Sequence, residues 1–307
     1  MTAADPTPTG RSITLEAEGV RAELGTVAAV LRGLTVHGIA VTEPLPADST
    51  PPMAAGIVLA PWPNRVRDAA WTLDGDRQQL DITEVSRSNA IHGLLRNTDY
   101  EVRAQSPDAV TLGALIPSQH GWPFLLDTWV RYELRPDGLA VTHGVANHSG
   151  RPAPHAVGAH PYFRIGATPV EQLRLTVSAS TYYEVDDRMN PLAEHPVEGT
   201  AYDLRAGVPL ADLALDTPFG GVAPGIAAQL TAPDGARVEL LHDADWRYLQ
   251  VFTAREFPRP AGRGLAVALE PMTAAPDALN SGDGLRWLGS GERWEGGWAV
   301  RYVPGPR

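Results

Sequence analysis

The chain has 307 residues, of which 43% are hydrophobic and 20% charged, and a formal net charge of −11 at pH 7. It contains no Cys, which excludes disulfides, thiol nucleophiles and Cys-ligated zinc or iron–sulfur centres. All 25 basic residues are Arg, so Schiff-base and phosphate-loop lysines are excluded as well. We therefore expect a globular protein in which His, Asp, Glu, Arg and Tyr carry any chemistry.

The acidic charge balance argues against a nucleic-acid partner, because such binding depends on basic patches that face phosphates. The first residues lack a basic segment followed by an apolar core, so we expect no signal peptide. The longest apolar stretch, Met53 to Pro63, is too short to span a membrane and contains proline. We expect a cytoplasmic protein, monomeric or homodimeric, that acts on a small molecule.

The predicted secondary structure is a series of short strands, because 30 Gly and 28 Pro are spread along the chain and interrupt long helices. The segments predicted as strands are 12–17, 27–31, 109–116, 126–134, 139–146, 173–178, 227–232, 238–242, 248–253 and 265–269. Asp-Gly pairs at 74–75, 137–138 and 234–235 predict hairpin turns between extended segments. A short helix is predicted at 274–279. These features predict one all-β domain over residues 11–303, after a flexible N-terminus at residues 1–10.

Metal ligands are not predicted. His155 and His160 are five residues apart, as are His143 and His148, and neither pair has the spacing of a zinc-binding helix. No Asp- and Asn-rich calcium loop is present. We expect neither a metal nor a cofactor.

An imidazole and a carboxylate form a natural catalytic pair in a chain without Cys or Lys. Pro161 restricts His160 to an extended backbone, and Tyr162 could form one wall of a pocket. Glu270 ends the apolar segment 265–269, where a carboxylate is costly unless it is paired or functional. Composition and spacing alone favour the plainer interpretation of a core histidine and an ordinary residue at a strand end.

A third segment adds polar residues suited to a sugar. Asn64 and Arg65 could hold hydroxyl groups through amide and guanidinium donors, and Trp62 could stack on a pyranose face. His92 precedes Gly93 further along the chain. The plainer interpretations are a surface ion pair for Arg65 and a turn position for His92.

Together these segments resemble the aldose 1-epimerase (galactose mutarotase) family, from residue 61 to the end of the chain. The motifs that carry the resemblance occur in the family's order and are Asn64-Arg65, His92-Gly93, His160-Pro161-Tyr162-Phe163 and Glu270-Pro271-Met272-Thr273. The resemblance implies a large antiparallel β-sandwich of the galactose mutarotase type. It also implies reversible interconversion of the α and β anomers of an aldose, without a cofactor.

The resemblance also implies residue roles. Glu270 matches the family's general base, His160 its general acid and His92 a second histidine near the ring oxygen, while Asn64 and Arg65 match sugar-binding positions. In this mechanism the base removes the proton of the anomeric hydroxyl while a protonated His160 supplies one to the ring oxygen.

Two weaker matches complete the predicted site. Asp216 resembles a substrate-binding aspartate of the family, and Gln250 resembles a pocket glutamine on a strand.

The identity of the sugar stays open, because Trp62 and Leu94 depart from the pattern of the best-known members. Glucose, galactose or a modified hexose are candidates, and the motifs favour a neutral sugar. A hexose 6-phosphate would need basic residues, for which Arg67 or Arg96 could serve. Two further hypotheses are a non-catalytic carbohydrate-binding protein on the same fold and a structural sandwich without a ligand.

Overall fold

The computed structural model describes residues 7–306. Short strands dominate this part of the chain, and each ladder between named strands is antiparallel. The α-helix α1 (Ala278–Ser281) is a single turn. The all-β, antiparallel architecture predicted from the sequence is therefore confirmed. Across residues 7–306, no helix has the length and apolar character needed to cross a membrane.

The largest sheet has nine strands in the order β10-β11-β12-β13-β27-β23-β22-β17-β20. Their bounds are β10 (Glu101–Gln105), β11 (Ala109–Ile116), β12 (Leu126–Arg135), β13 (Gly138–Asn147), β27 (Arg293–Val303), β23 (Arg237–His242), β22 (Gly225–Thr231), β17 (Arg174–Val177) and β20 (Val208–Pro209). Along β12, buried residues alternate with more exposed ones, as expected for a strand with one face toward a core.

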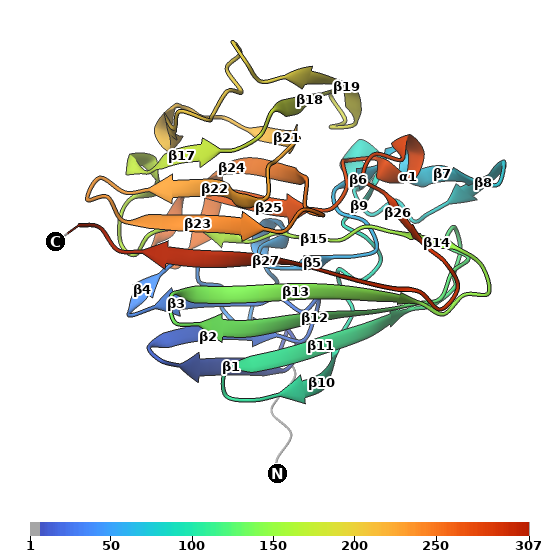
Figure 1. The fold of residues 1–307 in the computed structure, drawn as a ribbon, viewed down its shortest axis with the longest axis horizontal. Helices are drawn as coiled ribbons and strands as arrows, with labels where there is room; N and C mark the ends of the chain where they lie inside the picture. The colour runs from blue at the N-terminus through green and yellow to red at the C-terminus, as the bar shows by residue number, and fades with distance from the viewer. Residues whose placement is uncertain (1–6, 307) are drawn as a thin grey trace.

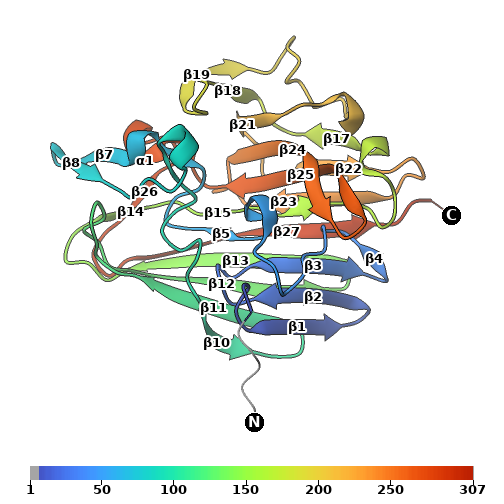
Figure 2. The ribbon, with the colours of Figure 1, turned by 180° about the vertical axis from the view of Figure 1, so that it is seen from behind.

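Two further sheets cover one face of this large sheet (Figures 1 and 2). The first has four strands, β1 (Ser12–Ala17), β2 (Val20–Gly25), β3 (Leu31–Val36) and β4 (Ile39–Ala40). The second has eight strands, β19 (Pro191–Pro196), β18 (Thr181–Val185), β21 (Asp216–Gly220), β24 (Tyr248–Arg259), β25 (Gly262–Met272), β15 (Gly158–Ala159), β5 (Val58–Leu59) and β16 (Tyr162–Phe163). One apolar core joins the three sheets, with Leu24, Val130 and Val251 fully buried in it.

Three short ladders and the helical turn α1 gather at one end of the sheets, on the right in Figure 1. The ladders are β6 (Arg65–Val66) with β9 (Ala90–Ile91), β7 (Ala70–Leu73) with β8 (Asp76–Gln79), and β14 (Ala153–His155) with β26 (Arg286–Leu288). The 3₁₀ turns among residues 7–306 are η1 (Pro52–Ala54), η2 (Arg67–Ala69), η3 (Val85–Arg87), η4 (Val170–Gln172) and η5 (Leu210–Asp212). Residues 52–96 thus form an irregular segment with little regular structure of its own.

The hairpins at the three Asp-Gly pairs are present, because these turns join β7 to β8, β12 to β13 and β22 to β23. The strand predicted at 27–31 is wrong. Ala28 and Ala29 have φ angles of +55° and +48°, so the backbone turns there between β2 and β3. The predicted helix at 274–279 lies a few residues later, at α1, and β27 was not predicted.

Part of the predicted flexible N-terminus, residues 1–6, lies outside the described residues. In the described part Thr9 is fully buried, and its hydroxyl donates a hydrogen bond to the carbonyl of Ala47 at 3.1 Å.

Candidate active site

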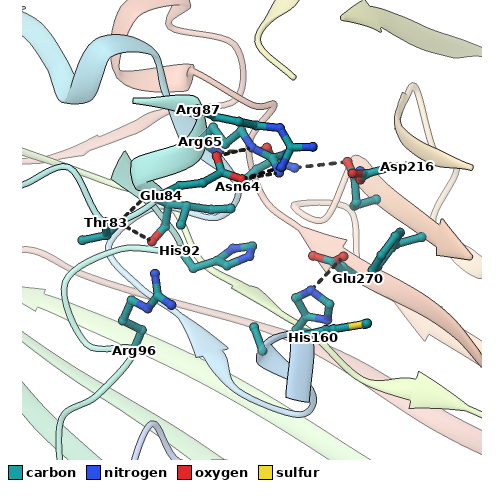
Figure 3. A pocket seen from close by; sticks show the side chains of 15 residues that line it. Asn64, Arg65, Thr83, Glu84, Arg87, His92, Arg96, His160, Asp216 and Glu270 are labelled. Carbon is teal, nitrogen blue, oxygen red and sulfur yellow. Dashed lines mark hydrogen bonds and ion pairs between the residues drawn. The ribbon is translucent and has the colours of Figure 1, made fainter. Parts of the chain in front are cut away.

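A cavity of about 430 Å³ lies between the irregular segment and strands β21, β24 and β25 (Figure 3). It brings together side chains from widely separated parts of the sequence. The predicted site residues that line it are Asn64, Arg65, His92, His160, Asp216, Gln250 and Glu270. Trp62 and Tyr162 are the two predicted site residues that do not line it.

Adjacent strands of the eight-stranded sheet supply the carboxylates and the amide. Glu270 on β25 lies directly opposite Gln250 on β24, and Asp216 begins the next strand, β21. The Gln250 side-chain amide donates to Asp216 Oδ1 at 2.6 Å and accepts from Asn64 Nδ2 at 3.1 Å. These hydrogen bonds fix the orientation of three polar side chains at the cavity wall.

His160 faces Glu270 because of strand register. β15 and β16 lie on either side of His160 and both pair with β25, in a register that sets residue 160 opposite residue 270. His160 Nε2 lies 3.2 Å from Glu270 Oε1, and the two residues are only 5% and 2% exposed. His160 Nδ1 and Glu270 Oε2 have no hydrogen-bond partner among the described residues.

Burial shifts both pKa values of this pair. Burial, with a smaller contribution from the positive charge of Arg65, lowers the pKa of His160 to about 4. Burial and the nearby charge of Asp216 raise the pKa of Glu270 well above its ordinary range. The pair therefore holds one proton between these two pKa values. The sequence predicted a protonated His160, whereas burial favours the proton on Glu270.

His92 and Asn64 both have left-handed backbones, with φ angles of +62° and +54°. They lie at the same end of the ladder between β6 and β9, and the His92 amide donates to the Asn64 carbonyl at 2.8 Å. The residue after His92 must be glycine, since a Cβ on Gly93 would lie 2.0 Å from the carbonyl oxygen of Ala60. Non-glycine residues in such conformations often mark functional sites.

The ring of His92 lies edge-on to that of His160, with 5.4 Å between centroids. Burial lowers the pKa of His92 well below its ordinary value, and the charges of His160, Arg65 and Arg96 lower it further. His92 is therefore a neutral imidazole at neutral pH, suited to hydrogen bonding with a substrate oxygen.

Arg65 is held by an acidic partner that the sequence did not indicate. Its Nε and Nη2 donate to the two carboxylate oxygens of Glu84 at 2.8 and 2.9 Å, and Arg87 Nη1 donates to the same carboxylate at 2.9 Å. Burial alone would raise the pKa of Glu84, but the bonds and charges of the two arginines lower it. Arg65 is 7% exposed, so the interpretation of this residue as part of a surface ion pair is wrong. No local pattern marks Glu84 or Arg87 as cavity residues.

Trp62 belongs to the core. It is 2% exposed and packs against Trp122, with 5.7 Å between ring centroids. The prediction that it stacks on a sugar in this cavity is not supported, because Trp62 does not line the cavity and is buried in the apolar cluster.

Tyr162 also lies behind the site. It is 2% exposed, and its ring stacks on His160 with a centroid distance of 5.3 Å and an interplanar angle of 18°. On its other side it packs against Phe257 at 4.6 Å. Tyr162 therefore supports the imidazole from behind and does not form a cavity wall.

Within residues 7–306, no group of three or more His, Asp or Glu side chains is arranged to hold a metal ion. The described side chains offer one coupled proton donor and acceptor, a neutral imidazole and several hydrogen-bonding groups. This set suits proton transfer to and from a polyhydroxylated molecule.

The fold is that of the galactose mutarotase-like β-sandwich proteins. A solved galactose mutarotase-like protein from Clostridium acetobutylicum superposes with a TM-score of 0.83 over 95% of each chain, at 20% sequence identity. The chain matches the aldose 1-epimerase family over residues 11–301 and belongs to that family.

Among curated proteins, an uncharacterised Escherichia coli (strain K12) protein, YihR, is 34% identical over 285 residues, which is 92% of this chain and 90% of that protein. Human galactose mutarotase is 28% identical over 208 residues, which is 65% of this chain and 59% of the human protein. The human match thus spans less than two thirds of the human enzyme.

Proposed function

We propose that the protein is an aldose 1-epimerase that interconverts the α and β anomers of a hexose such as glucose or galactose. The observation that carries this proposal is the buried pair of His160 and Glu270, 3.2 Å apart in a cavity of hydrogen-bonding side chains. Family membership and the similarity to human galactose mutarotase support it.

The reaction uses the single proton of the pair. Glu270, as carboxylate, takes the proton of the anomeric hydroxyl while the His160 imidazolium donates one to the ring oxygen. The bond between C1 and the ring oxygen breaks and an aldehyde forms at C1. Rotation about the C1–C2 bond exposes the other face of the aldehyde, and both proton transfers reverse as the ring closes. The pair ends with the one proton with which it began.

The remaining polar side chains hold the sugar in the required orientation. Neutral His92 lies beside His160 and is placed to hydrogen-bond near the ring oxygen. Asn64, Gln250 and Asp216 form a hydrogen-bonded row at the cavity wall and would bind hydroxyls there. The cavity of about 430 Å³ is within the usual range for small-molecule sites, ~300–1,000 Å³.

A non-catalytic carbohydrate-binding protein on this fold is the main competing function. Binding alone requires no buried acid–base pair with pKa values shifted in opposite directions, and such a pair is costly to bury. The observed pair therefore favours the enzyme.

Proton exchange spectroscopy tests the proposal directly. Cross-peaks between the α and β anomeric protons of glucose or galactose should grow faster with the protein than without it. Addition of a chelator should leave this rate unchanged. Sugar binding without faster exchange would instead identify a binding protein.

A further inference from the structure

Arg96 lines the cavity, and its positive charge has no ion-pair partner among the described residues. Arg65 and Arg87 share the carboxylate of Glu84, whereas the side chain of Arg96 forms no ion pair or hydrogen bond with any residue from 7 to 306. Its Nε is buried and has no hydrogen-bond partner there. A guanidinium that is partly desolvated and unpaired is costly, unless a ligand supplies the missing anion.

Arg96 and the carboxylates lie on different sides of the cavity. Figure 3 shows Arg96 on the same side as His92, across the cavity from Asp216 and Glu270. Burial and nearby positive charges, among them Arg96, lower the pKa of His92, so this imidazole is neutral. Arg96 also lines a second hollow of about 300 Å³ whose lining includes no carboxylate. Asp81 lines a further hollow together with Arg96, but among the described residues no ion pair or hydrogen bond joins the two side chains.

The arrangement of atoms in a pyranose places one substituent on the side of the cavity that holds Arg96. If the proposed function holds, the ring oxygen faces His160 and His92. The ring oxygen is bonded to C5, and C5 carries C6, so the group on C6 extends past His92 in the direction of Arg96. Hydroxyls on the other ring carbons face the opposite wall.

We propose that Arg96 binds an anionic group on C6 of the substrate, and that the preferred substrates are hexoses charged at this position. A phosphate, a sulfate or a carboxylate would satisfy the guanidinium through charge-assisted, paired hydrogen bonds. Of the two arginines that the sequence suggested for a phosphate, Arg67 does not line the cavity and Arg96 does. This proposal rests on the proposed function, because the sugar's orientation follows from it.

The test compares glucose, glucose 6-phosphate and glucuronate by exchange spectroscopy, with wild-type protein, Arg96→Gln and Arg293→Gln. Arg293 is an exposed arginine on β27 outside the cavity, so it controls for the loss of one charge. The wild type should have a kcat/KM ~10–100-fold higher for at least one anionic sugar than for glucose, mainly through KM. Arg96→Gln should abolish most of this preference, because only the anionic sugars lose an ion pair. The better anionic sugar identifies phosphate or carboxylate as the anion.

Two results would overturn the proposal: glucose turned over as well as both anionic sugars, or Arg96→Gln slowing all three sugars equally. If no sugar is interconverted, the proposed function fails, and calorimetric binding of the same three sugars still tests Arg96. Tighter binding of an anionic sugar that Arg96→Gln removes would keep the proposal, and equal binding would end it. If Arg96→Gln does not fold, wild-type affinity for the anionic sugar should fall with salt while affinity for glucose does not, and equal salt dependence would contradict the proposal.

Discussion

His160 Nε2 lies 3.2 Å from Glu270 Oε1, and both side chains are almost completely shielded from solvent. Burial disfavours the charged form of each partner, so their pKa values move in opposite directions and the pair holds one proton between them. The presence of this single proton determines how the rate of anomer interconversion depends on pH and on substitutions of the two residues.

The rate of anomer interconversion should have a bell-shaped dependence on pH. The pKa of His160 is lowered to about 4, so a second proton enters the pair only near pH 4, and Glu270 then cannot accept the anomeric proton. On the alkaline side the rate falls when the pair loses its only proton, which the raised pKa of Glu270 delays. We expect a plateau through neutral pH in kcat/KM, measured from about pH 3.5 to 9 with the spontaneous rate subtracted. An alkaline limb near pH 6.5 would instead indicate a solvated imidazole that loses the proton of the pair there.

Glu84→Ala should weaken sugar binding more than it slows the chemical step. Without Glu84, Arg65 loses both hydrogen bonds that hold its guanidinium at the cavity. We expect KM to rise ~10-fold with a smaller change in kcat, because the lost positioning affects ground and transition states alike. Glu184→Ala is the matched control, since Glu184 is exposed and pairs with His195 outside the cavity. Unchanged kinetics in Glu84→Ala would show that Arg65 needs no such support.

Trp62→Ala should lower the free energy of unfolding by about 3–5 kcal/mol, because it removes a buried indole from the core. Urea denaturation measures this loss, and KM of the folded variant should change little. Trp287→Ala, at a residue that is 47% exposed, should be much less destabilising. A large rise in KM at unchanged stability would restore the stacking role predicted for Trp62.

Strand prediction succeeded where the pattern is local. The segments at 12–17 and 109–116 match β1 and β11, and the Asp-Gly pairs predicted three hairpins correctly. It failed at 27–31, where apolar residues form a tight turn that their side chains do not signal. β27 was missed because it contains Gly296 and Gly297, which weaken a strand pattern.

Short motifs predicted the central residues of the site. The other cavity residues come together only through contacts between distant parts of the chain. The motifs placed His160, Glu270 and His92 in one site, and the structure brings all three to the same cavity. Glu84 was missed because only the path of the irregular segment brings it to Arg65, 19 residues away. Trp62 was misplaced because a Pro-Trp-Pro sequence does not indicate which way the indole points.

Glu270→Gln, followed by exchange spectroscopy and sugar titration, tests the central claim most directly. Glutamine keeps the shape of the side chain and removes the base. We predict a fall in exchange rate of ~10²-fold or more with a much smaller loss of affinity, because the lost interaction forms mainly in the transition state. His160→Asn should behave in the same way, and Glu256→Gln, at an exposed position on β24, should match the wild type. A folded Glu270→Gln protein that interconverts anomers at nearly the wild-type rate would contradict the assignment of Glu270 as the base.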